Sequence, residues 1–330
     1  MKARPVGIAG LGSYVPEKIL TNADLERMVD TSDEWIRTRT GISTRHIAAK
    51  NQSTSDLACE AAKAALDDAG MEAADLDLII VATCTPDMLF PATACILQEK
   101  LGIKGVAAFD LEAACSGFIY GLAVGAQFIA AGIYENVLVV GAETLSRIVN
   151  WQDRNTCILF GDGAGAVVLK PAENGRGFLS FHLGADGAGA DLLKLAAGGA
   201  AMPASAETIA QGKHFLHMNG NEVFKFAVRV MGDAAEKCLN KAGISKEEIS
   251  FVVPHQANMR IVDAAMRRLD LPLEKAFINL DRYGNMSSAS IPVALNELYR
   301  ANRLTNGDIL LLVGFGAGLT WGSTIIEWSK

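Results

Sequence analysis

Two segments of this chain are related copies: AAKAALDDAG at residues 61–70 and AAEKCLNKAG at residues 234–243. They align without a gap at an offset of 173 residues (234 − 61). An acidic turn and an apolar run follow each copy, at residues 78–81 and at residues 251–253. Both runs are typical of buried strands.

The same offset recurs further along the chain, where LVVG at residues 138–141 pairs with LLVG at residues 311–314. One offset at two distant places indicates a duplicated α/β unit. We therefore predict two halves, at residues 1–170 and 218–330. The Gly- and Ala-rich residues 171–217 between them are predicted to be an irregular insertion over an active-site mouth, or alternatively a loose surface loop.

A cysteine stands where a nucleophile is expected. Cys115 lies between a strand-like run, residues 106–111, which we predict to be buried, and the uncharged helix-like residues 117–134. The partial positive charge of a helix N-terminus favours a thiolate and lowers the pKa of a thiol. The alternative for a cysteine among small residues is inert packing.

Two further polar residues also lie at the ends of predicted elements. His255 follows an apolar strand run, and Asn285 lies in a turn before another apolar stretch. Such positions commonly carry chemistry. Under the repeat, Cys115 corresponds to Ser288, three residues from Asn285, and His255 corresponds to Ala82 at the end of a neighbouring strand. A pseudo-twofold fold would therefore bring Cys115, His255 and Asn285 together.

These residues belong to motifs that run through nearly the whole chain, and together they resemble the β-ketoacyl-[acyl-carrier-protein] synthase III family of the thiolase superfamily. The family implies an α/β, thiolase-like fold with two pseudosymmetric halves in a five-layered αβαβα arrangement. Two positions depart mildly from the family pattern, Met286 and Ala317. The motifs are TNADL (21–25), TSDEWIRTRTGI (31–42), AACSGF (113–118), FGDGAG (160–165), VPHQANMRI (253–261), DRYGN (281–285) and FGAGLTWG (315–322).

The resemblance implies the initiating condensation of type II fatty-acid synthesis. Cys115 would take the acyl group of an acyl-CoA primer, and His255 and Asn285 would hydrogen-bond the thioester carbonyl of malonyl-[acyl-carrier-protein] during decarboxylation. The backbone N–H groups of Cys115 and Ala317 would hold the tetrahedral oxyanion. No cofactor is implied, because the CoA thioester is a substrate.

Two absences favour this reaction within the superfamily. A thiolase without decarboxylation would carry a second Cys in the Gly-rich loop at residues 314–318, which has none. An elongating condensing enzyme would carry a second catalytic His where this chain has Asn285.

The resemblance also assigns binding residues, for which ordinary surface or core roles are the alternative. An acidic carrier protein would meet basic residues at helical spacing, i and i+4 for Lys225 and Arg229, and i and i+7 for Arg260 and Arg267. The predicted CoA site is Trp35, Arg39, Thr40, Arg154, Asn221 and Asn258; carrier docking is Gln256, Ala257, Asn258, Met259, Arg260, Lys225, Arg229 and Arg267; the acyl pocket is Phe90, Cys84, Leu145 and Phe160.

Phe90 matches a family position that reaches the acyl pocket of a partner subunit, which implies a homodimer. The alternative is a core Phe within its own chain. The sequence leaves the length and branching of the primer open, because these pocket side chains cannot be sized from it.

Composition agrees with a cytoplasmic enzyme. The chain has 330 residues, half of them apolar, and a net charge of −7. This negative charge argues against binding to nucleic acid. An acidic protein partner could bind such a chain only at a local basic patch. Six cysteines without a disulfide spacing fit a reducing cytosol. Residues 6–11 are too short and too Gly-rich for a signal peptide.

Several other patterns are predicted to be structural. His214 and His217 lack the neighbouring ligands of a metal site. Residues 161–165 are predicted to be a tight turn and not a phosphate loop. Residues 117–134 have the length of a membrane span, but their many glycines favour a buried helix.

Two other function classes remain open: a papain-like cysteine hydrolase, whose local Cys signature is missing, and a catalytically silent binding protein with the same fold.

Overall fold

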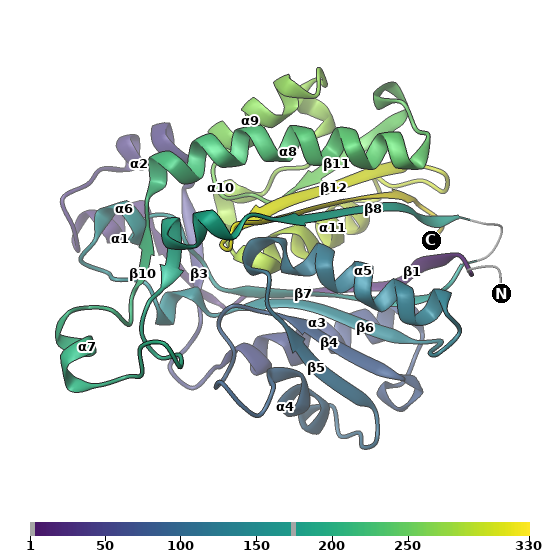
Figure 1. Ribbon diagram of the computed structural model, residues 1–330, viewed down its shortest axis with the longest axis horizontal. Helices are drawn as coiled ribbons and strands as arrows, with labels where there is room; N and C mark the ends of the chain where they lie inside the picture. The colour runs from purple at the N-terminus through teal and green to yellow at the C-terminus, as the bar shows by residue number, and fades with distance from the viewer. Residues whose placement is uncertain (1–3, 173–175) are drawn as a thin grey trace.

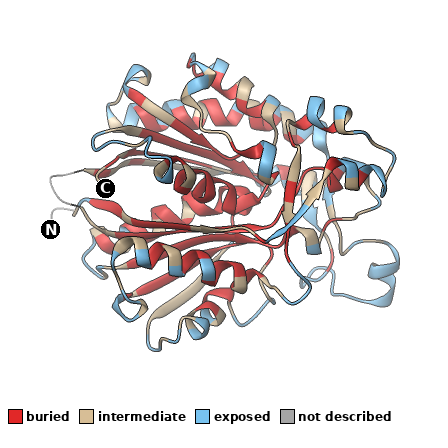
Figure 2. Ribbon diagram, turned by 180° about the vertical axis from the view of Figure 1, so that it is seen from behind, coloured by how far each residue is buried: buried red, intermediate tan, exposed pale blue. Residues whose placement is uncertain are grey.

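The computed structural model describes residues 4–172 and 176–330. Residues 1–3 fall in the predicted first half and residues 173–175 in the predicted insertion, and both lie outside the described residues. Two sheets and three helical layers alternate through the molecule (Figure 1). The burial pattern in Figure 2 places the buried residues along the two sheets and the helices between them.

The first sheet has the strand order β1-β7-β6-β4-β5. β4, β5 and β6 run parallel, and β1 and β7 are antiparallel to their neighbours. The central strands β4 and β6 are buried along their whole length, as expected for strands covered on both faces. The bounds are β1 (Val6–Tyr14), β4 (Leu78–Ala82), β5 (Ala107–Leu111), β6 (Val137–Glu143) and β7 (Gly163–Pro171).

The second sheet has the order β11-β12-β13-β8, with β11 and β12 parallel. Helices α8 and α9 cover its outer face, α5 and α11 lie between the two sheets, and α3 and α4 cover the first sheet (Figure 1). These are the five layers that the resemblance implied. The bounds are β8 (Gly177–Ala185), β11 (Ile249–Pro254), β12 (Ile309–Gly316), β13 (Thr320–Glu327), α3 (Thr54–Ala69), α4 (Thr93–Lys100), α5 (Gly117–Ala130), α8 (Gly220–Ala242), α9 (Met259–Arg268) and α11 (Ser290–Arg300).

Smaller elements surround the edge where the strands β4, β5 and β6 end. Two short hairpin-like pairs, β2 with β3 and β9 with β10, lie outside the main sheets. They are β2 (Lys18–Thr21), β3 (Thr44–Ile47), β9 (Leu193–Leu195), β10 (Leu216–Met218), α1 (Asn22–Glu26), α2 (Asp33–Thr40), α6 (Arg154–Cys157), α7 (Ala206–Ala210) and α10 (Leu280–Tyr283).

Three predictions about elements need correction. Residues 177–185 form β8 and pair with β13, so the predicted irregular insertion at 171–217 begins too early and the second half includes part of it. The strand predicted at 106–111 is only half-buried, because β5 is the edge of its sheet. α5 ends at Ala130, where the predicted run continued to residue 134.

α5 is 14 residues long, about 21 Å, which is short of a bilayer core of about 30 Å. Within residues 4–172 and 176–330, no helix is both long and apolar enough to cross a membrane. The glycines of α5 have a packing reason: a Cβ on Gly121 would lie 2.9 Å from Val139 on β6.

Candidate active site

Cys115 lies in a single 3-10 turn, Ala114–Ser116, which connects the end of β5 to α5. We call it the Cys115 turn. Ala114 adopts a positive φ of 45°, and its backbone N–H donates to Glu112 Oε1 at 2.9 Å. The turn therefore projects the Cys115 side chain from the carboxyl end of a parallel strand, where open α/β sheets bind ligands.

The acidity of Cys115 differs from the sequence-based expectation. Burial raises the pKa of the thiol to about 12, a hydrogen bond from Ser287 opposes this, and the charges of Glu143 and Glu112 raise it further. The resting residue is thus a thiol and not the thiolate that a helix N-terminus favours. The physical reason is that burial of the sulfur disfavours its charged form.

His255 follows β11 and is fully buried. Its backbone N–H donates to Val313 O at 2.7 Å, and its ring packs edge-on against Phe315, with centroids 5.5 Å apart. Neither ring nitrogen has a hydrogen-bond partner among the described residues. Burial lowers the pKa of His255 to about 3, so the imidazole is neutral near pH 7 and keeps one N–H donor and one acceptor for a ligand.

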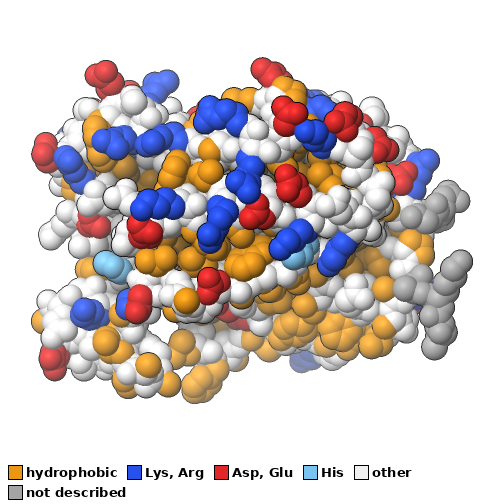
Figure 3. Space-filling view, turned by 45° about the horizontal axis from the view of Figure 1, so that its top comes forward, with side chains coloured by type: hydrophobic (Ala, Val, Ile, Leu, Met, Phe, Trp, Pro, Cys, Tyr) orange, Lys and Arg blue, Asp and Glu red, His pale blue; other side chains and the backbone are white. Residues whose placement is uncertain are grey.

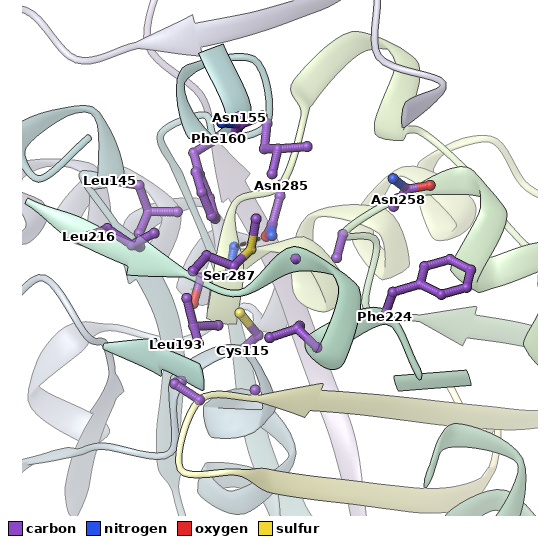
Figure 4. A pocket seen from close by; sticks show the side chains of 18 of the residues that line it. Cys115, Leu145, Asn155, Phe160, Leu193, Leu216, Phe224, Asn258, Asn285 and Ser287 are labelled. Carbon is purple, nitrogen blue, oxygen red and sulfur yellow. Dashed lines mark hydrogen bonds between the residues drawn. The ribbon is translucent and has the colours of Figure 1, made fainter. Parts of the chain in front are cut away.

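Asn285 is held in one orientation by its own turn. Its Oδ1 accepts the backbone N–H of Ser287 at 2.8 Å, and its backbone pairs with the strand-like segment at Phe160. Because Oδ1 is already engaged, the amide NH2 is the group left for a ligand. Figure 4 shows Asn285, Ser287 and Cys115 around the same opening.

One cavity of about 1150 Å³ is lined by Cys115, His255 and Asn285 together. The tertiary structure therefore brings the three predicted residues into one space, although they come from three distant segments. Other predicted residues that line it are Trp35, Arg39, Thr40, Cys84, Leu145, Phe160, Asn221, Ala257, Asn258, Arg260 and Ala317.

Five of the predicted CoA residues line this cavity, whereas the sixth, Arg154, is not among its lining residues and lies over the Trp35 ring. The guanidinium carbons of Arg39 and Arg154 lie 5.7 and 4.9 Å from the ring centroid of Trp35. Asn258 begins α9 and donates from Nδ2 to Arg39 O at 2.9 Å. Thr40 is buried and its hydroxyl donates to Ile36 O at 2.7 Å, so it closes α2 as well as lining the cavity.

The predicted docking residues divide into two groups. Gln256 is buried, with Oε1 accepting the N–H of Asn279 and Nε2 donating to Phe277 O at 3.0 Å. It cannot contact a protein partner, and its predicted docking role is wrong. No signal in the sequence indicated that Gln256 is buried, because the residues that cover its side chain belong to the loop after α9 and not to its own motif.

The remaining docking candidates lie on or near α8 and α9. Figure 3 views the molecule with its top turned forward, and on this face the Lys and Arg side chains are interspersed with acidic ones. Lys225 pairs with Glu222 at 2.7 Å, and Arg267 pairs with Asp263 at 2.7 Å. Arg229 is exposed. The guanidinium of Arg260 lies 5.3 Å from the Phe224 ring, and Met259 is half-buried against Gly41.

The acyl-pocket candidates also divide. Cys84, Leu145 and Phe160 line the cavity, whereas Phe90 lies outside it and is 84 % exposed. The alternative of a core Phe within its own chain is therefore wrong. The hairpin strands β9 and β10 add apolar lining residues that sequence reasoning missed, Leu193 and Leu216 among them (Figure 4).

Sequence reasoning also missed Ser287 and Glu143. Ser287 was detectable as the residue that corresponds to Ala114 under the repeat. Glu143 was detectable as a charge at the end of an apolar strand. Its buried carboxylate accepts from the hydroxyls of Thr85 at 2.6 Å and Ser288 at 2.8 Å.

The tight turn predicted at residues 161–165 is wrong, because Gly163, Ala164 and Gly165 are already the first residues of β7 and pair with neighbouring strands. The Asp162 carboxylate is buried and accepts the N–H groups of Ala48 at 2.7 Å and Ser146 at 2.9 Å. Asp162 stands just before β7 and anchors the start of the strand to the segments at Ala48 and Ser146, which is a structural role.

Two family models match the chain. One describes the 3-oxoacyl-[acyl-carrier-protein] synthase III C terminal and matches residues 239–328; the other describes 3-oxoacyl-[acyl-carrier-protein] synthase III and matches residues 109–187. The first contains His255 and Asn285, and the second contains Cys115.

Curated relatives match over nearly the whole length. The chain is 61% identical over 325 residues to β-ketoacyl-[acyl-carrier-protein] synthase III of Desulfitobacterium hafniense, covering 98% of each chain. It is 58% identical over 330 residues to the synthase III of Symbiobacterium thermophilum, covering 100% of each.

Solved structures agree. The crystal structure of 3-oxoacyl-[acyl-carrier-protein] synthase III from Aquifex aeolicus superposes with a TM-score of 0.91 at 47% identity, over 98% of this chain and 100% of that one. The synthase III of Thermus thermophilus also gives 0.91, at 51% identity over 98% and 99%. These similarities favour a synthase over a cysteine hydrolase.

Proposed function

This chain belongs to the β-ketoacyl-[acyl-carrier-protein] synthase III family, the acyltransferases that initiate fatty-acid synthesis, and we propose that it uses Cys115 to accept the primer and His255 with Asn285 to condense it. One observation carries the assignment: the three side chains line a single cavity in which both ring nitrogens of His255 have no partner among the described residues.

In the first step the Cys115 sulfur attacks the carbonyl carbon of an acyl-CoA. The bond between that carbon and the CoA sulfur breaks, and the thiol proton leaves with CoA. A thiol whose pKa burial raises to about 12 needs this proton to depart during attack. The oxyanion of the intermediate would be held by the backbone N–H groups of Cys115 and Ala317, because Ala317 lines the cavity next to Gly316, where an added Cβ would lie 2.6 Å from the Cys115 nitrogen.

In the second step the malonyl thioester loses CO2. The electron pair of the broken C–C bond moves into an enolate, whose oxygen accepts an N–H from neutral His255 and one from the Asn285 amide. The enolate carbon then attacks the acyl carbon on Cys115, and the Cys115 sulfur leaves and regains a proton. Two neutral donors suit this oxygen, since they stabilise charge as it develops.

Acyl-CoA would enter along the end of the cavity that Trp35 marks. The two guanidinium groups beside that ring are suited to the phosphates of CoA, and the indole face is suited to its adenine. An acidic carrier protein would approach the same mouth over α8 and α9, where Arg229 and Arg260 are exposed.

We also propose a homodimer in the cytosol. Leu89 is 76 % exposed beside Phe90, and the edge strand β5 is half-buried, so a second copy would cover apolar surface at both places. A cytosolic location suits a catalytic thiol, because that compartment keeps cysteines reduced.

The test is to incubate the protein with a panel of acyl-CoA thioesters and malonyl-[acyl-carrier-protein], and to read Cys115 acylation by intact mass and 3-oxoacyl product in the same samples. We expect Cys115→Ser to abolish both signals. His255→Ala and Asn285→Ala should still become acylated but lose condensation. Normal condensation by Asn285→Ala would refute its role, and acylation without malonyl-dependent product in the parent protein would indicate a transferase or hydrolase.

A further inference from the structure

A short connection joins β12 to β13 and lies against the Cys115 turn. β12 ends at Gly316 and β13 begins at Thr320, so residues 317–319 form the whole link. A Cβ on Gly316 would lie 2.6 Å from the Cys115 backbone nitrogen, which shows how closely the two segments approach. The spacing between them therefore sets the geometry of any oxyanion site made from both backbones.

Two hydroxyl groups bridge these segments. The Thr320 hydroxyl lies 2.9 Å from Ala113 O and 2.9 Å from Ala317 O. The Ser116 hydroxyl lies 2.8 Å from Ala113 O and 2.8 Å from Thr320 Oγ1. Ser116 is fully buried and Thr320 is half-buried, so the contact between the Ser116 hydroxyl and Ala113 O is shielded from competing water and the others are partly shielded.

The available donors suffice for both carbonyl groups. Ala113 O accepts the Ser116 backbone N–H at 3.2 Å, so Ser116 Oγ can donate to Thr320 Oγ1 while the Thr320 hydroxyl donates to Ala317 O, and each carbonyl then receives a donor. Because a peptide unit is planar, fixing the Ala113 and Ala317 carbonyls fixes peptide planes on both sides of the site. These planes adjoin those that carry the N–H groups of Cys115 and Ala317.

The far end of the connection has a separate anchor. The Leu319 N–H donates to Asp186 O at 2.9 Å, and the Asp186 N–H donates to Leu319 O at 2.8 Å. This pair ties the connection to the segment after β8, away from Cys115. Thr320 is thus the side chain that ties the connection to the Cys115 turn.

We propose that Thr320 is a positioning residue, whose hydroxyl, with that of Ser116, sets the separation between the backbone N–H groups of Cys115 and Ala317 that receive the oxyanion. The inference rests on the proposed function. It adds a residue outside the three that react with substrate, and it assigns Thr320 to both chemical steps, since each passes through an oxyanion at this place.

The test compares Thr320→Val, which keeps the shape and removes the hydroxyl, with Thr320→Ser, which keeps the hydroxyl. Thr320→Ala is measured beside them, so that a folding failure of the Val variant does not decide the result. Thr324→Val is the matched control, because Thr324 is buried on the same strand and its hydroxyl donates to Ser180 O at 2.9 Å, away from the site.

We expect Thr320→Val and Thr320→Ala to lower kcat for acyl transfer and for condensation alike, by about 10- to 100-fold, with KM within about twofold, because small misplacements of catalytic groups cost up to about 10² in rate. Thr320→Ser should restore the rates to within about threefold of the parent. Unfolding midpoints of all variants are measured in parallel.

Two results would overturn the inference: parent-like kcat in the variants that lack the hydroxyl, or equal losses in the Ser and Val variants. A loss confined to one of the two steps would also count against it. Acylation of the parent protein is measured first. A parent without acyl-Cys115 overturns the proposed function and this inference with it, whereas an active parent with active Thr320→Val and Thr320→Ala variants overturns this inference alone.

Discussion

Two turns of this protein share one backbone shape and have opposite surroundings. The Cys115 turn corresponds under the repeat to the 3-10 turn Ser287–Ala289, which we call the Ser288 turn. Each has a non-glycine residue at positive φ in its first position, Ala114 at 45° and Ser287 at 48°. Each leads into a buried helix between the sheets. Yet Cys115 faces the cavity, while the Ser288 hydroxyl lies 2.8 Å from both Ala82 O and Glu143 Oε1.

The residue opposite each turn explains the difference. Glu143, at the end of β6, and Gly316, at the end of β12, are counterparts at the offset of 173 (316 − 143). Glu143 fills the space beside Ser288 with a carboxylate, whereas Gly316 places only backbone beside Cys115. The duplicated framework therefore supports a turn in both halves, and one side chain at a strand end determines whether the central residue of the turn, Cys115 or Ser288, faces the cavity.

The strongest way to break this contrast is to put a side chain beside Cys115. We expect Gly316→Ala to slow acyl transfer and condensation by about 10² to 10³, the effect of losing one oxyanion donor, because the new Cβ would lie 2.6 Å from the Cys115 nitrogen. Single-turnover acylation measured by intact mass checks this. Gly199→Ala is the control, since a Cβ there meets nothing within 4 Å, and equal activity of both variants would contradict the account.

A smaller effect should follow from neutralising the acid beside Ser288. Burial is the main cause that raises the pKa of Cys115, and the charge of Glu143 adds to it. Removing that charge in Glu143→Gln should lower the pKa of Cys115. At any pH below about 12 the fraction of Cys115 present as thiolate then rises. A decrease of up to roughly one pKa unit would raise that fraction up to about tenfold, so we expect alkylation by iodoacetamide to accelerate about three- to tenfold.

Peptide mapping across a pH series measures this rate at Cys115, with the exposed Cys95 as internal reference. An unchanged pH profile at Cys115 would mean that the Glu143 carboxyl is uncharged in the folded protein. Burial raises the pKa of Glu143, while the Thr85 and Ser288 hydroxyls oppose that shift.

The smallest expected effect concerns the closed turn itself. Ser288→Ala removes the hydroxyl that links the second half to Ala82 and Glu143, and we expect a loss of about 1 kcal/mol in the free energy of unfolding. Acylation and condensation rates should stay within about twofold, since Ser288 does not line the cavity. Urea unfolding at fixed protein concentration gives the first value. A rate loss larger than tenfold would show that the Ser288 hydroxyl, and not only its neighbour Ser287, shapes the active site.

Local signals in the sequence were sufficient for much of this protein. The recurrent offset predicted two related α/β halves, and the ends of apolar runs located Cys115 and His255 at strand ends. Such features depend on nearest neighbours along the chain, where apolar periodicity and turn residues act directly. They were insufficient for β8, which reads as irregular because its pairing partner, β13, lies more than a hundred residues away.

The sequence by itself therefore identified the family to which the chain belongs, and it predicted the duplication and the candidate reactive side chains. The tertiary structure decided which side chains are exposed and what surrounds each reactive group. Gln256 and Arg260 belong to one motif, but Gln256 is buried with its amide bonded to the segment at Phe277 and Asn279, whereas Arg260 is exposed. Likewise, burial of the assembled cavity raises the pKa of Cys115 and lowers that of His255, because desolvation requires the whole set of layers around a group and no local pattern encodes it.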